Sequence, residues 1–194
     1  MVEGDQVLGF EALVRWEHPQ RGLLCPDQFI TLAEETGLVV PLGEWVLRTA
    51  VGTARRWSAA TDTAGLTMSV NLTAQQLHIA GLADLVRQCQ ESMTPWWLGL
   101  ELTESTLMDD TPTVAAVIED LAAPGARLTI DDFGTGFSSL AYLTRLPVRR
   151  LKVDRSFVAD LQRKPEATTV VAAIIGLPTS SGCRWSPRAS RPGP

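Results

Sequence analysis

Short apolar segments alternate with longer segments of helical periodicity along most of this 194-residue chain. Strands joined by helices of this length predict βα units and a mainly parallel sheet, so the fold class is α/β. The expected strands cover residues 8–16, 67–72, 98–103, 127–130 and 150–153. The expected helices cover 26–37, a stretch with Val46, Leu47, Ala50, Val51, Ala54 and Trp57 on one face, 75–92, 112–123, a short segment from Ser138 or Ser139 to Pro147, and 168–177.

The charge and cysteine content exclude several classes of protein. A net charge of -5 and a pI near 5.1 argue against a nucleic-acid binder, which needs a basic surface to replace phosphate counterions. The three cysteines show no CxxC spacing, which favours a reducing compartment over a disulfide framework or a zinc site. No signal peptide or membrane span is visible, so we expect a cytoplasmic protein with neither a nucleic-acid nor a membrane partner.

Acidic and amide side chains follow the expected strands one after another. In a parallel α/β barrel the carboxyl ends of the strands converge on one face, where carboxylates repel one another unless cations neutralise them. Hard oxygen donors without cysteine or histidine favour Mg²⁺ or Mn²⁺. Taken singly, each residue could equally be a solvated strand end or a helix cap. The set comprises Glu11, Asn71, Glu101, Glu104, Asp131, Asp132 and Asp154.

A series of short motifs in this order and spacing resembles the EAL domain family over about residues 4–177. The resemblance implies a TIM-like (β/α) barrel and a phosphodiesterase that opens cyclic-di-GMP to linear pGpG. The motifs are 11–16 (EALVRW), His18-Pro19, Gly22, 71–73 (NLT), 101–105 (ELTES), 131–136 (DDFGTG) and 152–154 (KVD).

The resemblance also implies a role for each motif residue. Glu11, Asn71, Glu101 and Asp131 would bind a first metal ion. Asp132 and Asp154 would contribute to a second, which Asp131 would bridge. Lys152 would hold the attacking water, and Glu104 would anchor the 131–136 loop. Arg15 would contact a substrate phosphate and Leu13 would line the substrate site. Two divalent ions, Mg²⁺ or Mn²⁺, could then activate a hydroxide and neutralise the displacement at phosphorus.

EAL domains often form homodimers and often follow a diguanylate cyclase or sensory domain, and the resemblance extends both expectations to this chain.

Other motifs in the sequence are weaker indicators of function. The DFG sequence at 132–134 lacks the companion motifs of a protein kinase. Trp96 and Trp97 are interpreted as packing residues. Arg149 and Arg150 are interpreted as a solvated strand edge, with guanine or phosphate contact as the alternative.

The family pattern places one strand before residue 1 and two after residue 177, including a last metal-binding glutamate. We therefore expect an EAL domain over residues 1–177 that lacks its first strand and last two strands, with turnover near background. Residues 178–194 contain four prolines and three arginines, which predicts a disordered tail. Read in a shifted frame with GC-rich codons, this tail can encode HELGLSVVAEGVETRA, so our hypothesis is a frameshift, which the nucleotide sequence decides.

Three functional hypotheses follow from the sequence. The chain is a metal-dependent cyclic-di-GMP phosphodiesterase domain, a non-catalytic receptor or interaction module, or an unstable fragment without activity of its own. An assay with Mn²⁺ and cyclic-di-GMP separates them, since they differ in product formation and in binding.

Overall fold

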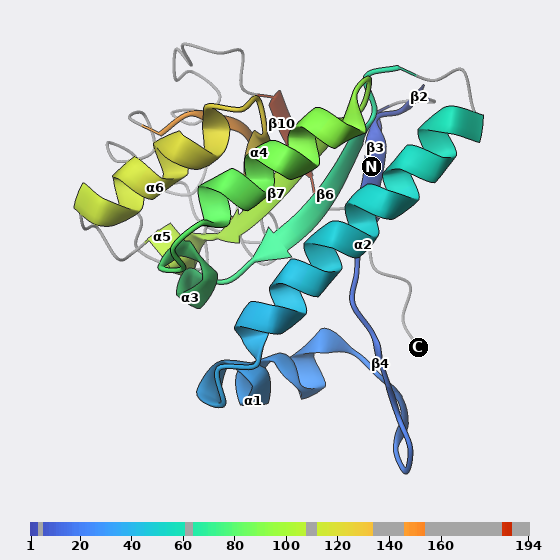
Figure 1. Ribbon diagram of the computed structural model, residues 1–194, viewed down its shortest axis with the longest axis vertical. Coiled ribbons are helices and arrows are strands. Elements are labelled where there is room, and N and C mark those ends of the chain that lie inside the picture. The colour runs from blue at the N-terminus through green and yellow to red at the C-terminus, as the bar shows by residue number, and fades with distance from the viewer. Residues whose placement is uncertain (4–5, 61–63, 108–111, 134–145, 154–183, 188–194) are drawn as a thin grey trace, which may run out of the picture.

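A single parallel sheet organises the computed structural model, which describes residues 1–3, 6–60, 64–107, 112–133, 146–153 and 184–187 (Figure 1). Six strands lie in the order β3-β6-β7-β8-β9-β10, and every neighbouring pair is parallel. Their bounds are β3 Gly9–Ala12, β6 Thr67–Leu72, β7 Trp97–Thr103, β8 Arg127–Phe133, β9 Val148–Val153 and β10 Arg184–Pro187.

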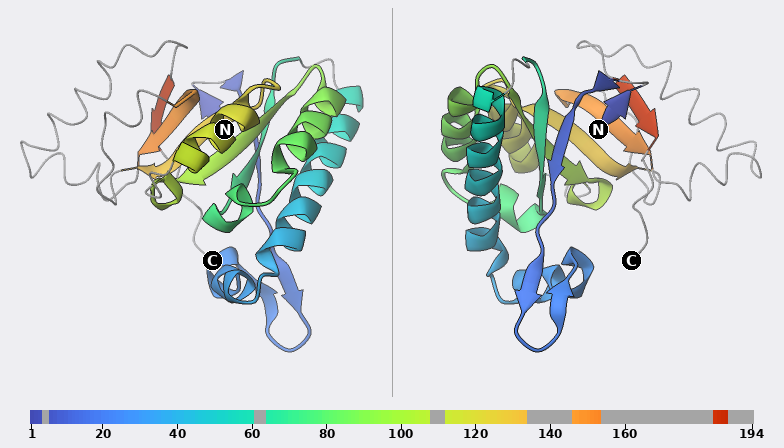
Figure 2. Two further views of the ribbon diagram at one scale, coloured as in Figure 1. Left: turned by 60° about the vertical axis from the view of Figure 1, so that its left-hand side comes forward. Right: turned by 90° about the vertical axis from the view of Figure 1, so that its right-hand side faces the viewer.

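Three long helices connect the first strands of this sheet. They are α2 (Val39–Ala60), α4 (Leu82–Met93) and α6 (Pro112–Ala122), and all three cover the same face (Figure 2). Spatial order follows chain order without reversal, whereas a doubly wound sheet reverses direction and carries helices on both faces. The arrangement is that of part of a TIM-like barrel, with the helices outside and the other face of the sheet toward the barrel interior.

Smaller elements flank the sheet. The antiparallel hairpin of β1 (Val2–Glu3) and β2 (Gln6–Val7) precedes β3, and the hairpin of β4 (Trp16–His18) and β5 (Gly22–Leu24) follows it. The short helices are η1 (Pro26–Gln28), α1 (Ile30–Glu35), α3 (Ala74–Leu77) and α5 (Glu104–Leu107). The β4–β5 hairpin projects beyond the carboxyl ends of the strands (Figure 1).

The period of two along each strand separates an apolar face from a polar one. Val70, Leu100 and Ile130 belong to the core cluster between the sheet and the helices, which contribute Val86 and Ile118. The alternate positions carry mainly polar residues and face the barrel interior. These interior residues are Thr67, Ser69, Asn71, Glu101, Arg127, Thr129, Asp131, Arg150 and Lys152.

The expected strands are confirmed, with changed bounds. Residues 67–72 form β6 as predicted, and β7, β8 and β9 extend the other predictions by one to three residues. The prediction of one strand over 8–16 was too long, because β3 ends at Ala12 and residues 16–18 turn into the β4–β5 hairpin. The apolar run alone did not show that its second half pairs locally rather than in the main sheet.

The expected helices are confirmed where the structure describes them, but two are divided. Residues 26–37 form η1 and α1, which are separated at Phe29 by a non-helical backbone (φ −143°, ψ −16°). Residues 75–92 form α3 and α4, because Gly81 adopts a left-handed conformation (φ 88°) that starts a new helix. The helices expected at 138–147 and 168–177 fall almost wholly outside the described residues, which include only 146 and 147 of them.

Within the segment 178–194, residues Arg184–Pro187 form β10 beside β9, so disorder was the wrong expectation for these four residues. The others lie outside the described residues. In the described part of the chain, no helix combines the length and apolar character needed to cross a membrane.

Candidate metal and phosphodiester site

Five of the predicted site residues meet inside the barrel, toward the carboxyl ends of five successive strands. Glu11 comes from β3, Asn71 from β6, Glu101 from β7, Asp131 from β8 and Lys152 from β9. The register explains their convergence, since Asn71 is paired with Glu101 and Asp131 is paired with Thr103 two residues further along β7. We call these five residues the carboxylate cluster.

Lys152 lies at the centre of the carboxylate cluster. Its Nζ donates to Oε2 of Glu101 and to Oδ2 of Asp131 at 3.4 Å, and lies 3.7 Å from Oε2 of Glu11. At the rim of the cluster, Nδ2 of Asn71 donates to Oε1 of Glu11 at 3.1 Å. One ammonium group therefore faces three carboxylates. Its charge can neutralise only one of them, so the cluster keeps an excess of negative charge.

Burial strengthens the interactions of Glu101, Asp131 and Lys152, which are shielded from water, whereas Glu11 is half-buried and Asn71 is exposed at the rim. Glu101 is 1% exposed, Asp131 4% and Lys152 8%. Burial raises the pKa of Glu101, and the negative charges of Glu11 and Asp131 act in the same direction against the opposing effect of Lys152. Burial by itself lowers the pKa of Lys152, but its three carboxylate neighbours outweigh this and raise it above the ordinary value. Lys152 is thus held in its charged form.

One buried oxygen bears on whether the cluster suits a metal ion. Among the described residues, Oε1 of Glu101 has no hydrogen-bond partner, whereas buried carboxylate oxygens are normally paired. A divalent cation would satisfy this oxygen, and the surrounding carboxylate and amide oxygens are the donors that Mg²⁺ and Mn²⁺ prefer. The residues fit such an ion by donor chemistry and by this unpaired atom. They do not form a preformed geometry: among the described residues, no three His, Cys, Asp or Glu side chains are arranged as a metal site.

The end of β8 changes the direction of the chain beside the cluster. Asp132 adopts a left-handed backbone conformation (φ 56°), and its amide donates to Oδ1 of Asp131 at 2.9 Å. The pairing with β9 shifts between Ile130 and Phe133. As a result Asp131 faces the barrel interior and Phe133 returns to the core, while Asp132 is half-buried. A positive φ is unfavourable for a non-glycine residue and is common at functional sites.

A cavity of about 320 Å³ adjoins the cluster at the carboxyl ends of β3 and β6. Leu13 and Asn71 both line it. Leu13, which was predicted to line the substrate site, therefore shares this cavity with a predicted metal ligand. Arg15 is exposed, and its Nη1 donates to the carbonyl oxygen of its neighbour Val14 at 2.8 Å. In the described part of the chain, no contact joins Arg15 to the carboxylate cluster, so its role in binding phosphate stays a prediction.

The remaining predicted residues lie at or beyond the limits of the described structure. Glu104 starts α5 directly after β7 and is 2% exposed, but residues 134–136 of the loop that it was predicted to anchor are not among the described residues. Asp154 also lies outside them. Sequence reasoning missed Gln76 and gave no role to Thr73, the last residue of the 71–73 motif, although both line the cavity with Asn71. Thr73 precedes the short helix α3 as its N-cap and Gln76 lies within it, and no sequence pattern distinguished Gln76 from an ordinary capping residue.

The model of the EAL domain family matches residues 1–184 of this chain. A bifunctional diguanylate cyclase/cyclic di-GMP phosphodiesterase of Pseudomonas aeruginosa, MucR, is 47% identical over 173 residues, covering 88% of this chain and 25% of the relative. The cyclic di-GMP phosphodiesterase PdeR of Escherichia coli is 37% identical over 174 residues, covering 89% of this chain and 26% of the relative. The chain thus spans about a quarter of the length of these curated relatives.

Solved structures give the same result for the fold. A structure of the MucR phosphodiesterase in complex with c-di-GMP has a TM-score of 0.82 and 41% identity, covering 97% of this chain and 76% of the other. The EAL domain of Mycobacterium smegmatis DcpA has a TM-score of 0.62 and 35% identity, covering 75% and 66%. Both structures are therefore similar to this chain in sequence as well as in fold.

Proposed function

This chain belongs to the EAL domain family, and on that premise we propose that it binds cyclic-di-GMP and hydrolyses it to linear pGpG with two divalent metal ions, Mg²⁺ or Mn²⁺. The observation that carries the proposal is the carboxylate cluster, in which four oxygen-bearing side chains and one lysine from five strands meet at the carboxyl end of a parallel barrel. The similarity to named cyclic di-GMP phosphodiesterases supports it.

The metal-binding residues follow from the donor set. Glu11, Asn71, Glu101 and Asp131 would hold the first ion, in agreement with the unpaired oxygen of Glu101. Asp132 and Asp154 would complete a second site that shares Asp131. When bound, the two ions would supply positive charge at the scissile phosphate and lower the pKa of a bound water.

The protein residues hold and orient the reactants. Lys152 is charged and buried among carboxylates, so its ammonium can donate to a water at the barrel mouth and hold its oxygen in line with the phosphorus. Asp132, in its left-handed conformation, directs Asp131 into the barrel. Glu104, buried at the start of α5, would fix the loop that follows Asp132.

The substrate would enter from the cavity lined by Leu13 and Asn71. Its volume of about 320 Å³ lies within the range of small-ligand sites, and Asn71, which lines it, is hydrogen-bonded to Glu11 of the carboxylate cluster. Leu13 is 40% exposed and offers an apolar contact for a base or ribose. Arg15, two residues further along, would pair with a phosphate once its side chain leaves the carbonyl of Val14.

Partners and location extend the same proposal. We propose a cytoplasmic domain that forms an EAL homodimer and acts with a diguanylate cyclase or sensory domain. The support is the printed name of MucR, which joins the cyclase and phosphodiesterase activities, and the match of this chain to about a quarter of that protein.

Hydrolysis and binding are separated by one experiment on the purified chain. Cyclic-di-GMP is incubated with Mn²⁺, products are resolved by chromatography, and binding is measured in parallel by calorimetry. The proposal predicts linear pGpG, with the rate lowered at least about 100-fold in a Glu101→Gln variant, because a buried charge beside the reacting phosphate is lost. Asp84→Asn, an exposed change on α4, is the matched control and should leave the rate unchanged.

Binding without product would favour the receptor hypothesis. Turnover near background, the expectation from the sequence, is the alternative to the hydrolysis proposed here, and this assay decides between the two. A folded chain that neither binds nor hydrolyses cyclic-di-GMP would overturn the proposal.

A further inference from the structure

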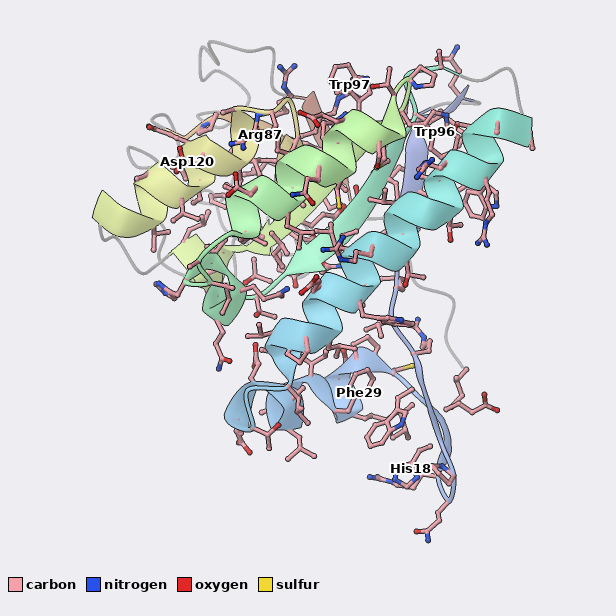
Figure 3. All side chains as sticks on the ribbon, in the orientation of Figure 1. His18, Phe29, Arg87, Trp96, Trp97 and Asp120 are labelled. Atoms are coloured by element: carbon pink, nitrogen blue, oxygen red, sulfur yellow. The ribbon has the colours of Figure 1, made fainter. Side chains whose placement is uncertain are left out.

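A second cavity, of about 610 Å³, lies at the opposite end of the barrel interior, where the strands begin. Its walls come from the starts of β6, β8 and β9 and from the segment that leads into β3. Polar side chains dominate the lining: Thr67, Ser69, Arg127, Thr129, Arg149 and Arg150. Trp97, which starts β7, marks this end of the sheet in Figure 3, away from His18 and Phe29 at the other end.

Three arginines share this cavity: Arg127, Arg149 and Arg150. Among the residues that the structure describes, no aspartate or glutamate lines it. In the described part of the chain, none of the three forms an ion pair. Burial lowers the pKa of Arg127, and the positive charges of Arg149 and Arg150 lower it further. The protein therefore holds three cations close enough to repel one another, an arrangement that an anion would stabilise.

Arg127 is also fixed in orientation. Its Nη1 donates to Oγ1 of Thr67 at 3.0 Å, and its guanidinium lies over the ring of Trp97, 4.5 Å from the ring centroid. A guanidinium held in this way loses little further freedom when it binds a ligand. The hydroxyls of Ser69 and Thr129 project from β6 and β8 into the same cavity. The Ser69 hydroxyl and Nη1 of Arg150 donate to Sδ of Met1, at 3.9 Å and 2.9 Å, a weak acceptor that an anion would replace.

We propose that this cavity is a binding site for a phosphate group, either free or carried on a small molecule, distinct from the carboxylate cluster. A guanidinium matches two oxygens of a phosphate at once, and three of them with neighbouring hydroxyls suit a tetrahedral dianion. The volume exceeds what inorganic phosphate needs and lies within the range of small-molecule sites, which leaves room for an organic group.

This site differs in charge from the proposed catalytic site, although the two share strands. Arg150 precedes Lys152 by two residues on β9, about 6.6 Å along a strand, and both face the barrel interior. A free phosphate could reach the carboxylate cluster only through bound metal, because the carboxylates repel it. A chelator therefore restricts phosphate binding to the arginine cavity and makes the test independent of the proposed function.

The test is calorimetric titration of the metal-free full chain, in chelator and at constant ionic strength, with inorganic phosphate and with adenosine 5′-monophosphate. We expect saturable binding at one site, weakened about tenfold or more in Arg127→Gln and in Arg149→Gln. Arg149 is exposed, so its variant should fold even if Arg127→Gln disturbs the contacts with Thr67 and Trp97. Arg55→Gln, an exposed change on α2, is the control and should bind as the unmodified chain does.

Equal affinity for both probes would identify the phosphate group as the whole ligand, and tighter binding of the nucleotide would identify a phosphorylated metabolite. Glu101→Gln should leave phosphate binding unchanged under these conditions. Absence of saturable binding, or equal binding by the unmodified chain and a folded Arg149→Gln variant, would overturn the proposal.

Discussion

Lys152 and Glu101 show how single residues prepare this barrel for a cation. Each is buried, and each would be costly to bury alone. Together with Asp131 and Glu11 they form a group in which one positive charge faces three negative ones. Within the part of the chain that the structure describes, Oε1 of Glu101 is the buried oxygen of this group that lacks a hydrogen-bond partner.

Glu101 should give the metal-free protein a characteristic pH dependence. A carboxyl with a raised folded-state pKa binds its proton more tightly in the folded than in the unfolded chain. Stability from this group is present below the unfolded pKa, about 4.3, and is lost as pH rises through the folded pKa. In chelator, the unfolding free energy of Glu101→Gln minus that of the unmodified chain should therefore increase with pH across this window. Urea denaturation at a series of pH values measures it, and a constant or decreasing difference would count against the assignment.

The cysteines should differ in reactivity. Burial raises the pKa of the Cys89 thiol; Arg48 opposes this and Glu44 adds to it. Cys89 is 5% exposed, whereas Cys25 lies at the surface. At pH 8 we expect iodoacetamide to modify Cys25 in the native chain well before Cys89, because little thiolate forms at the buried position. Mass spectrometry of digests taken over time checks the order, because it follows the peptides of Cys25 and Cys89 separately. Equal rates in native protein would show that α4 does not shield Cys89.

At the scale of elements, close contacts between β3 and β6 set the geometry of the cluster. Glu11 reaches Asn71 because β3 is paired in register with β6, with Gly9 opposite Thr67. A Cβ at Gly9 would lie 2.0 Å from the carbonyl oxygen of Thr67. Both residues belong to paired strands, so this clash could be relieved only by moving β3 away from β6. The sequence pattern predicted a strand here but gave no sign that only glycine fits this position.

Gly9→Ala should therefore destabilise the fold by about 1–3 kcal/mol, the usual cost of forcing extra atoms into a packed region. Gly52→Ala is the matched control, since a Cβ at this exposed position of α2 meets nothing within 4 Å. That change should stabilise the protein by about 0.5–1 kcal/mol through helix propensity. Urea denaturation of both variants provides the comparison. Equal stabilities for the two would show that β3 can move away from β6 without loss.

At the scale of the whole molecule, helices on one face and strands in sequential order bring five strand ends to one place. No two neighbouring strands contain the site, so its assembly depends on the complete sheet from β3 to β9. Any ion bound there links these strands, and its binding free energy is added to the folding free energy.

Manganese should accordingly stabilise the folded chain. At a hundredfold excess over the dissociation constant, the gain is about 2.7 kcal/mol for one site. Asp131→Asn should lose most of this gain because it removes the charge proposed to serve both ions, whereas Asp84→Asn on the exposed side of α4 should retain it. Urea denaturation with manganese and with chelator measures both. A gain that Asp131→Asn retains in full would place the ion elsewhere.

The amino-acid sequence by itself predicted most of the element types and their order in the part of the chain that the structure describes, and it placed Glu11, Asn71, Glu101 and Asp131 at strand ends, whereas Lys152 was predicted only from the resemblance to a family. Hydrophobic period and turn chemistry are local properties, and polar residues at successive strand ends must converge in any parallel barrel. Only the tertiary structure decided that β3 stops at Ala12, that Lys152 is surrounded by three carboxylates, and that Arg127, Arg149 and Arg150 share one cavity. The sequence could not reveal these features, because each depends on the register between strands that are distant in the chain, and no local pattern encodes that register.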